Sequence, residues 1–204
     1  LLAARLQPGT PLTDRLFAWP GDVGPQGDSV PLRLAGALHA LRLTDERRLA
    51  AVYPPAEADD AALWEAVAAV MDDRAAEIGR FLDSPPQTNE VRRAAAVLAA
   101  LHWLGARHPG PVRLSELGAS AGLNLMADRF AVATPVGPLG AAVPALTLHP
   151  DWRAGVPAGP APRVTDRGGC DIRPIDPGAE RLRLRAYLWP DQPERLRLTQ
   201  AAIE

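Results

Sequence analysis

The side chains best suited to chemistry lie in one short segment. Residues 115–124 read Ser-Glu-Leu-Gly-Ala-Ser-Ala-Gly-Leu-Asn. Val112, Leu114 and Leu117 form an apolar run that is typical of a strand, and the apolar residues from Leu123 onward are typical of a helix. The order therefore predicts a strand, a tight turn of small residues and a helix whose first N–H groups are free to bind a ligand.

In one interpretation this turn holds a cofactor. Glu116 ends a parallel strand, and the small residues after it let the backbone approach a ligand that larger side chains would block. An acid followed by small residues at +2, +4 and +6 resembles the first motif of S-adenosylmethionine-dependent methyltransferases, with Ser120 in place of the middle glycine. The resemblance implies that Glu116 orders the turn or accepts a hydrogen bond from the amine of S-adenosylmethionine, and that Asn124 adds a polar contact. The cofactor-binding residues it implies are Glu116, Gly118, Ala119, Ser120, Gly122 and Asn124.

Two other interpretations of the turn stay open. Gly118-x-Ser120-x-Gly122 is also the pattern of the nucleophile elbow of α/β-hydrolases, in which Ser120 attacks an acyl carbon with a histidine base and an acid. Against this, helices rather than strands are predicted before residue 110, and His149 is the only histidine downstream. The third interpretation is a structural turn that binds nothing.

Acidic residues further along the chain are candidates for the same site. In nucleotide-binding sheets an acid at the end of the second strand holds the ribose hydroxyls. Asp171 and Asp176 lie in an extended, proline-stiffened segment and are predicted to face a ligand, with Asp151 as a weaker candidate. The alternative for Asp171 and Asp176 is a capped turn with an ion pair to Arg167 or Arg173.

One tryptophan is a further candidate for a substrate contact. Leucine and arginine alternate from Leu182 to Leu188, which is typical of a half-exposed strand. Trp189 would then follow the strand at the functional edge of the sheet, where it either faces the substrate or packs in the core.

Composition excludes several classes of function. All 22 Lys+Arg positions are arginine, so Schiff-base chemistry and a phosphate-loop lysine are excluded. A net charge of −2 supplies no basic field for nucleic acid, and the four histidines lack the spacing of metal ligands. We therefore expect a small-molecule substrate, no metal and no nucleic acid, with an oligomeric state that the sequence leaves open.

Cysteine usage and hydropathy indicate the compartment. Cys170 is the single cysteine and cannot form an intrachain disulfide, which fits a reducing cytoplasm. The longest apolar run, residues 94–106, is shorter than the about 20 residues that a membrane span needs. We expect a cytoplasmic protein without a membrane span.

Periodicity predicts a helical first half and a mixed second half. Helices are predicted from Ser29 as a cap, near Thr44, over residues 59–82 and over residues 89–107. Strands are predicted over 112–117, 145–148, 163–165 and 182–188, and a last helix over 193–204. The predicted fold is α/β: a helical cap domain, residues 1–108, and a partial Rossmann-like, methyltransferase-like sheet, residues 109–204, that continues beyond the last residue.

A longer stretch resembles a known family. Residues 116–125 and Asp128-Arg129-Phe130, with 167–171, 174–176 and 188–192 downstream, are similar to the sequence blocks of an uncharacterised bacterial family, domain of unknown function 2332. The resemblance covers most of the chain. It implies a bacterial protein that is longer than this chain, and it implies no activity.

Overall fold

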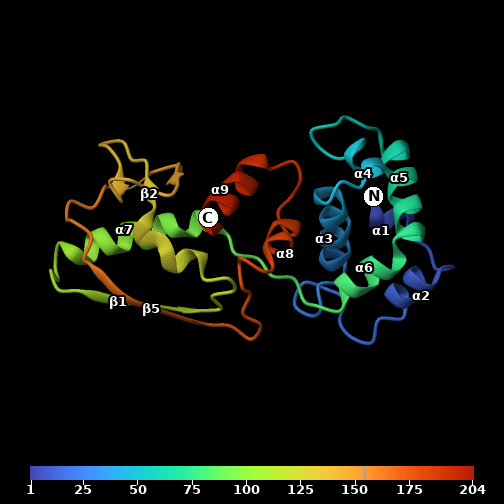
Figure 1. The fold of residues 1–204 in the computed structure, drawn as a ribbon, viewed down its shortest axis with the longest axis horizontal. Helices are drawn as coiled ribbons and strands as arrows, with labels where there is room; N and C mark the ends of the chain where they lie inside the picture. Colours follow the sequence, from blue (N-terminus) through green and yellow to red (C-terminus); the bar gives the residue numbers. More distant parts are fainter. Residues whose placement is uncertain (154) are drawn as a thin grey trace. The chain divides into compact units, whose positions relative to one another are not determined.

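The computed structural model describes residues 1–153 and 155–204. Its contacts group the chain into two compact units, residues 1–87 with 182–193, and residues 88–181 with 194–204 (Figure 1). Helices make up the first unit, whereas the strands of the described residues lie in the second. The predicted mixed α/β class is confirmed. The predicted division into independent domains at residue 108 stays a prediction.

The first unit is built from helices around one apolar core. Leu34, Leu38 and Leu41 are buried in that core, as their spacing predicts. Asp59 caps its helix, because its Oδ1 accepts a hydrogen bond from the N–H of Ala62 at 2.8 Å. The helices are α1 (Leu2–Arg5), α2 (Pro11–Phe17), α3 (Val30–Leu43), α4 (Arg47–Ala50), α5 (Asp60–Asp73), α6 (Ala75–Leu82) and, except for its first residue, α8 (Arg181–Ala186).

One local prediction in this unit is wrong, and two are confirmed only in part. The single helix predicted over 59–82 is divided into α5 and α6 at Arg74, whose φ of −112° and ψ of 22° leave the helical region. Thr44 ends α3 instead of starting a helix, and α4 begins after Glu46. Ser29 occupies the N-cap position of α3, as predicted, but its side chain makes no capping bond: the residue is left-handed, with φ 49°, and its hydroxyl faces the carbonyl of Pro25.

One arginine of this unit, Arg33, is buried. Arg33 is only 6% exposed. Its Nε and Nη2 donate to the carbonyl and the carboxylate of Asp28, and its Nη1 donates to the carbonyl of Leu82 at 2.9 Å. The guanidinium also lies over the ring of Trp19. A planar group with several fixed donors satisfies such a site, which a lysine ammonium would not.

The strand predicted over residues 182–188 is wrong: residues 182–186 belong to α8, and Tyr187 and Leu188 follow it. Tyr187 and Leu188 are adjacent and both buried, whereas adjacent residues of a strand point to opposite faces. Leu182 is 38% exposed, although a strand would place it on the same face as the buried Leu184. Arg183 donates to the carbonyls of Ser84 and Pro85. Leucine and arginine are both strong helix formers, so their alternation is compatible with either structure, and packing decides between them.

The second unit contains the strands. Strand β1 (Val112–Leu117) pairs in parallel with β5 (Val164–Cys170), with Leu117 opposite Cys170. Strand β2 (Ala131–Val132) pairs with β3 (Leu139–Gly140) in antiparallel fashion and with β4 (Thr147–Leu148) in parallel. The helical segments are η1 (Val91–Arg93), α7 (Ala94–Gly105), η2 (Leu123–Arg129) and α9 (Pro193–Ile203). The predictions of β1, of the helix before it and of the last helix are confirmed, although β5 is longer than predicted.

The short 3-10 helix η2 packs on the parallel pair of strands β1 and β5. The strands β1 and β5 run alongside each other in Figure 1, and η2 packs against both strands and against α7. Leu98, Phe130, Val132 and Leu148 are fully buried in the core of this unit. Among the described residues no helix is long and apolar enough to cross a membrane. The packing places the turn after β1 at the edge of this core.

The packing of Tyr187, the residue after α8, against α3 can be tested at one glycine. A Cβ on Gly36 would lie 2.5 Å from Cε1 of Tyr187, too close for real contacts. We expect Gly36→Ala to destabilise the protein by about 1–3 kcal/mol, although alanine is the better helix former. Gly79→Ala is the matched control, because its Cβ would meet only Nη1 of Arg15 at 3.5 Å, and we expect it to be neutral or stabilising by up to about 1 kcal/mol. Urea unfolding measures the stability of both variants, and equal stabilisation would contradict the packing of Tyr187 on α3.

Candidate functional site

The turn after β1 has an unusual backbone. Gly118, Ser120 and Gly122 are all left-handed, with φ of 68°, 51° and 69°. Glycine adopts this region freely, whereas a serine pays a cost of about 1 kcal/mol there. Because β1 and β5 are parallel, the turn lies at the same edge as the end of β5. Residues 118–122 therefore form a strained loop, called the β1 loop below, at the carboxyl end of a parallel pair.

Most N–H groups of the β1 loop are bound within the protein. Gly118 and Ala119 donate to the carbonyl of Cys170 at 2.9 and 3.1 Å, and Gly122 donates to the carbonyl of Ala119. The N–H of Ser120 donates to Oδ2 of Asp171 at 2.8 Å. The expectation that the loop and the following helix offer free donors is therefore wrong for most of these groups.

The first residue of η2 is also bound, by a residue that sequence reasoning missed. The N–H of Leu123 donates to Oδ1 of Asn89 at 3.0 Å, and Asn89 is buried. Asn89 lies 34 residues earlier in the chain, before η1. Its burial is the signal that identifies it, because a buried amide needs a partner; the sequence carries no such signal.

In contrast, the site contains acceptors without partners. Oε2 of Glu116, Oγ of Ser120 and Oδ1 of Asn124 are buried atoms that have no hydrogen-bond partner among the described residues. Ser120 and Asn124 are 6% and 4% exposed. Such orphan groups are rare in proteins because each costs free energy. These three oxygens are acceptors whose hydrogen-bonding capacity the described residues leave unused.

The carboxyl group of Glu116 has a raised pKa. Burial raises the pKa of Glu116, while the hydrogen bond from Asn124 and the charge of Arg93 lower it; burial is the largest effect. The side-chain N–H group of Asn124 thus donates a hydrogen bond to Glu116, while its side-chain oxygen, Oδ1, has no partner. The predicted pair Glu116 and Asn124 is brought together by the fold.

Open space and apolar side chains flank these acceptors. A Cβ on Gly118 would meet no atom within 4 Å. Leu117 is 87% exposed at the end of β1, and Ile172 is fully exposed just beyond the end of β5. Large apolar side chains exposed beside buried polar atoms favour a ligand with both apolar and donor groups.

The geometry of a serine nucleophile is not found here. Ser120 is buried, and its Oγ has no hydrogen-bond partner, so no described imidazole activates it. A nucleophile elbow instead exposes its serine beside a histidine base.

Of the other predicted site residues, the fold brings one to the β1 loop. Asp171 contacts Ser120 as described. Oδ1 of Asp176 accepts from the N–H groups of Gly178 and Ala179 at 2.8 and 3.3 Å, which is a capped turn. Asp151 forms an ion pair with Arg153. Trp189 is 46% exposed and belongs to the helical unit, where it follows α8 and not a strand.

The described residues contain no cluster of metal-ligating side chains, and the single cysteine lies at the end of β5. Within residues 1–153 and 155–204 no three His, Cys, Asp or Glu side chains gather where they could hold a metal ion. Cys170 is exposed and free at the end of β5.

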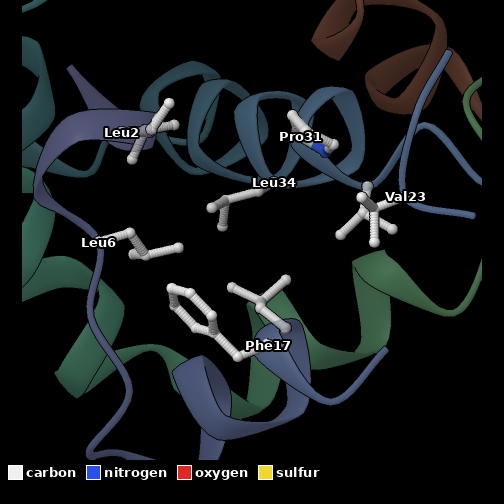
Figure 2. Close-up of a pocket in the computed structure, with 9 residues that line it drawn as sticks. Leu2, Leu6, Phe17, Val23, Pro31 and Leu34 are labelled. Atoms are coloured by element: carbon white, nitrogen blue, oxygen red, sulfur yellow. The ribbon is translucent and has the colours of Figure 1, made fainter. Parts of the chain in front are cut away.

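A separate hollow lies in the helical unit. Figure 2 shows Leu2, Leu6, Phe17 and Leu34 directed toward a pocket of about 340 Å³. Its lining is apolar throughout and carries no group that could do chemistry. The lining residues are Leu2, Ala3, Leu6, Leu16, Phe17, Val23, Val30, Pro31 and Leu34.

Comparison with known families identifies the chain. The model of a family described as "Uncharacterized protein conserved in bacteria (DUF2332)" matches residues 1–204, the whole of the chain. The chain belongs to this family. The resemblance of residues 116–125 to DUF2332 is therefore confirmed, whereas the resemblance of the same motif to methyltransferases stays a prediction. Comparisons with curated proteins and with solved structures gave no match.

The raised pKa of Glu116 in this DUF2332 protein predicts that the free energy of unfolding falls as the pH rises. The folded chain binds the Glu116 proton more tightly than the unfolded chain, so ionisation above the ordinary pKa of 4.5 removes stability as pH rises. We expect Glu116→Gln, which keeps the shape and the hydrogen bond from Asn124, to be more stable than the wild type at pH 8. The gain should shrink toward pH 5.

Thermal unfolding across this pH range measures the effect. Glu65→Gln is the control, because Glu65 is an exposed carboxylate on α5 and its loss should leave the pH dependence unchanged. A Glu116→Gln protein that is less stable than the wild type at pH 8 would contradict the prediction.

Proposed function

We propose that this chain binds S-adenosylmethionine at the β1 loop and belongs to an enzyme that transfers its methyl group to a small molecule. The observation that carries the proposal is the set of three buried oxygens without partners, on Glu116, Ser120 and Asn124, beside open space over Gly118. These are residues of the motif that resembles the methyltransferases.

The polarity of the site favours this cofactor over a phosphate ligand. A phosphate needs N–H donors or cations, and the N–H groups of Gly118, Ala119, Ser120 and Leu123 are already bound within the protein. S-adenosylmethionine instead carries an ammonium group, ribose hydroxyls and a sulfonium charge. The carboxyl group of Glu116 and the two neutral oxygens of Ser120 and Asn124 are suited to receive such donors.

The strand arrangement supports the same proposal. β1 and β5 are adjacent and parallel, and Asp171 comes directly after β5. An acid in this place is the one that contacts ribose in nucleotide-binding sheets. The exposed side chains of Leu117 and Ile172 offer an apolar surface for the adenine or the methionine chain. A Rossmann-like sheet is part of this proposal.

When bound, S-adenosylmethionine supplies an electrophilic methyl group. The contribution of this chain is to bind and orient it: Glu116 and Asn124 hold the donor groups, while Gly118 and Gly122 let the backbone lie close. Burial of Ser120 and Asn124 keeps water from competing for these bonds.

Isothermal titration calorimetry, which measures the heat of binding of S-adenosylmethionine and of S-adenosylhomocysteine, tests the proposal. We expect both to bind, and Glu116→Gln to weaken S-adenosylmethionine by about tenfold or more, because a bond to a charged group is worth about 1.5–3 kcal/mol. Glu65→Gln, which removes an exposed carboxylate elsewhere, should bind as the wild type does.

Absence of heat and of thermal stabilisation with both ligands would refute the proposal. Turnover of an activated ester that Ser120→Ala abolishes without unfolding the protein would favour the hydrolase instead.

A further inference from the structure

Ser120 is the strained point of the β1 loop. It is the only non-glycine among the three left-handed residues of the loop, with φ 51°. A residue in such a conformation persists only when the surrounding structure holds it there. Its side chain does not help, because Oγ has no partner. The restraint must come from the backbone of Ser120 and what it contacts.

Both backbone polar groups of Ser120 are bound by one segment, residues 171–175. Its N–H donates to Oδ2 of Asp171 at 2.8 Å, and its carbonyl accepts from the N–H of Ile175 at 3.2 Å. The other carboxylate oxygen of Asp171 accepts from the N–H of Arg173 at 2.8 Å, which fixes the carboxylate within its own turn. The segment after β5 therefore clamps the loop after β1.

The two segments are also in tight contact beside this clamp. A Cβ on Gly169 would lie 2.6 Å from Cβ of Ala119, so only glycine lets β5 approach the loop this closely. This close approach brings the loop within reach of Asp171. It also explains why a carboxylate 51 residues away can hold Ser120.

We propose that Asp171 is a positioning residue of the cofactor site, which holds Ser120 in the left-handed conformation and thereby presents the free oxygens of Glu116, Ser120 and Asn124 to the ligand. The inference rests on the proposed function for the identity of the ligand. It assigns to Asp171 a role distinct from contact with the ribose: the carboxylate acts through the loop. An ionised acceptor suits this role, since its hydrogen bonds to N–H groups are stronger than neutral ones.

Four variants test the proposal. Asp171→Ala removes both acceptors, Asp171→Asn keeps one, and Ser120→Gly removes the conformational penalty because glycine is left-handed without cost. The fourth is the double variant Asp171→Ala with Ser120→Gly. Asp176→Ala is the matched control, since Asp176 lies in the same segment but caps a turn at Gly178 and Ala179.

Amide hydrogen exchange of residues 118–125 and the dissociation constant of S-adenosylmethionine are the two measurements. We expect Asp171→Ala to speed exchange at Ser120 by about tenfold or more and to weaken binding by a similar factor. For Asp171→Asn, both the exchange rate at Ser120 and the dissociation constant should lie between those of Asp171→Ala and the wild type. Asp171→Ala should raise the dissociation constant by a smaller factor when Ser120→Gly is also present. A general loss of stability would not produce this rescue. Asp176→Ala should change neither quantity.

The outcomes separate this inference from the proposed function. Exchange and binding that are unchanged in Asp171→Ala would overturn the inference. If the wild type does not bind S-adenosylmethionine, the proposed function fails, and exchange at Ser120 still decides whether Asp171 holds the loop. If Asp171→Ala does not fold, Asp171→Asn decides: wild-type exchange at Ser120 would overturn the inference, and faster exchange confined to the loop would support it.

Discussion

The parallel pairing of β1 with β5 is the constraint on which the candidate site depends. It brings the ends of two strands that are far apart in sequence to one edge, with Leu117 opposite Cys170. The carbonyl of Cys170 then binds the N–H groups of Gly118 and Ala119, and Asp171 binds that of Ser120. Without this pairing the N–H groups of Gly118, Ala119 and Ser120 would lose these partners.

The same hydrogen bonds determine which ligands the loop suits. A turn between a strand and a helix usually offers N–H donors, which attract phosphate. Here the protein uses most of those donors itself, and Asn89 takes one more from Leu123. The groups left over are oxygens, on Glu116, Ser120 and Asn124. A ligand that donates hydrogen bonds would match these oxygens, and burial raises the pKa of Glu116 above its usual value.

Local sequence signals predicted much of the scaffold. The helix cap at Asp59, the buried leucines of α3, strand β1 and the family to which residues 116–125 belong could all be inferred from neighbouring residues. Predictions failed where a pattern fits two structures. The alternation of leucine and arginine over 182–188 places leucines both two and four residues apart, so it suits a strand or a helix, and contact with α3 favoured the helix α8.

The short loop of small residues after a strand, with an acid and an amide beside it, can be inferred from the amino-acid order alone. These features depend on neighbours within about ten residues and on intrinsic preferences of the backbone. The contacts of Asp171 with Ser120 and of Asn89 with Leu123, and the turn capped by Asp176, become visible only in the folded chain. Those contacts join segments 51 and 34 residues apart in the first two cases, and no local pattern encodes which acid or amide will meet a given N–H group. Packing of the strands and helices makes that choice, because each buried polar group must find a partner where the fold leaves it.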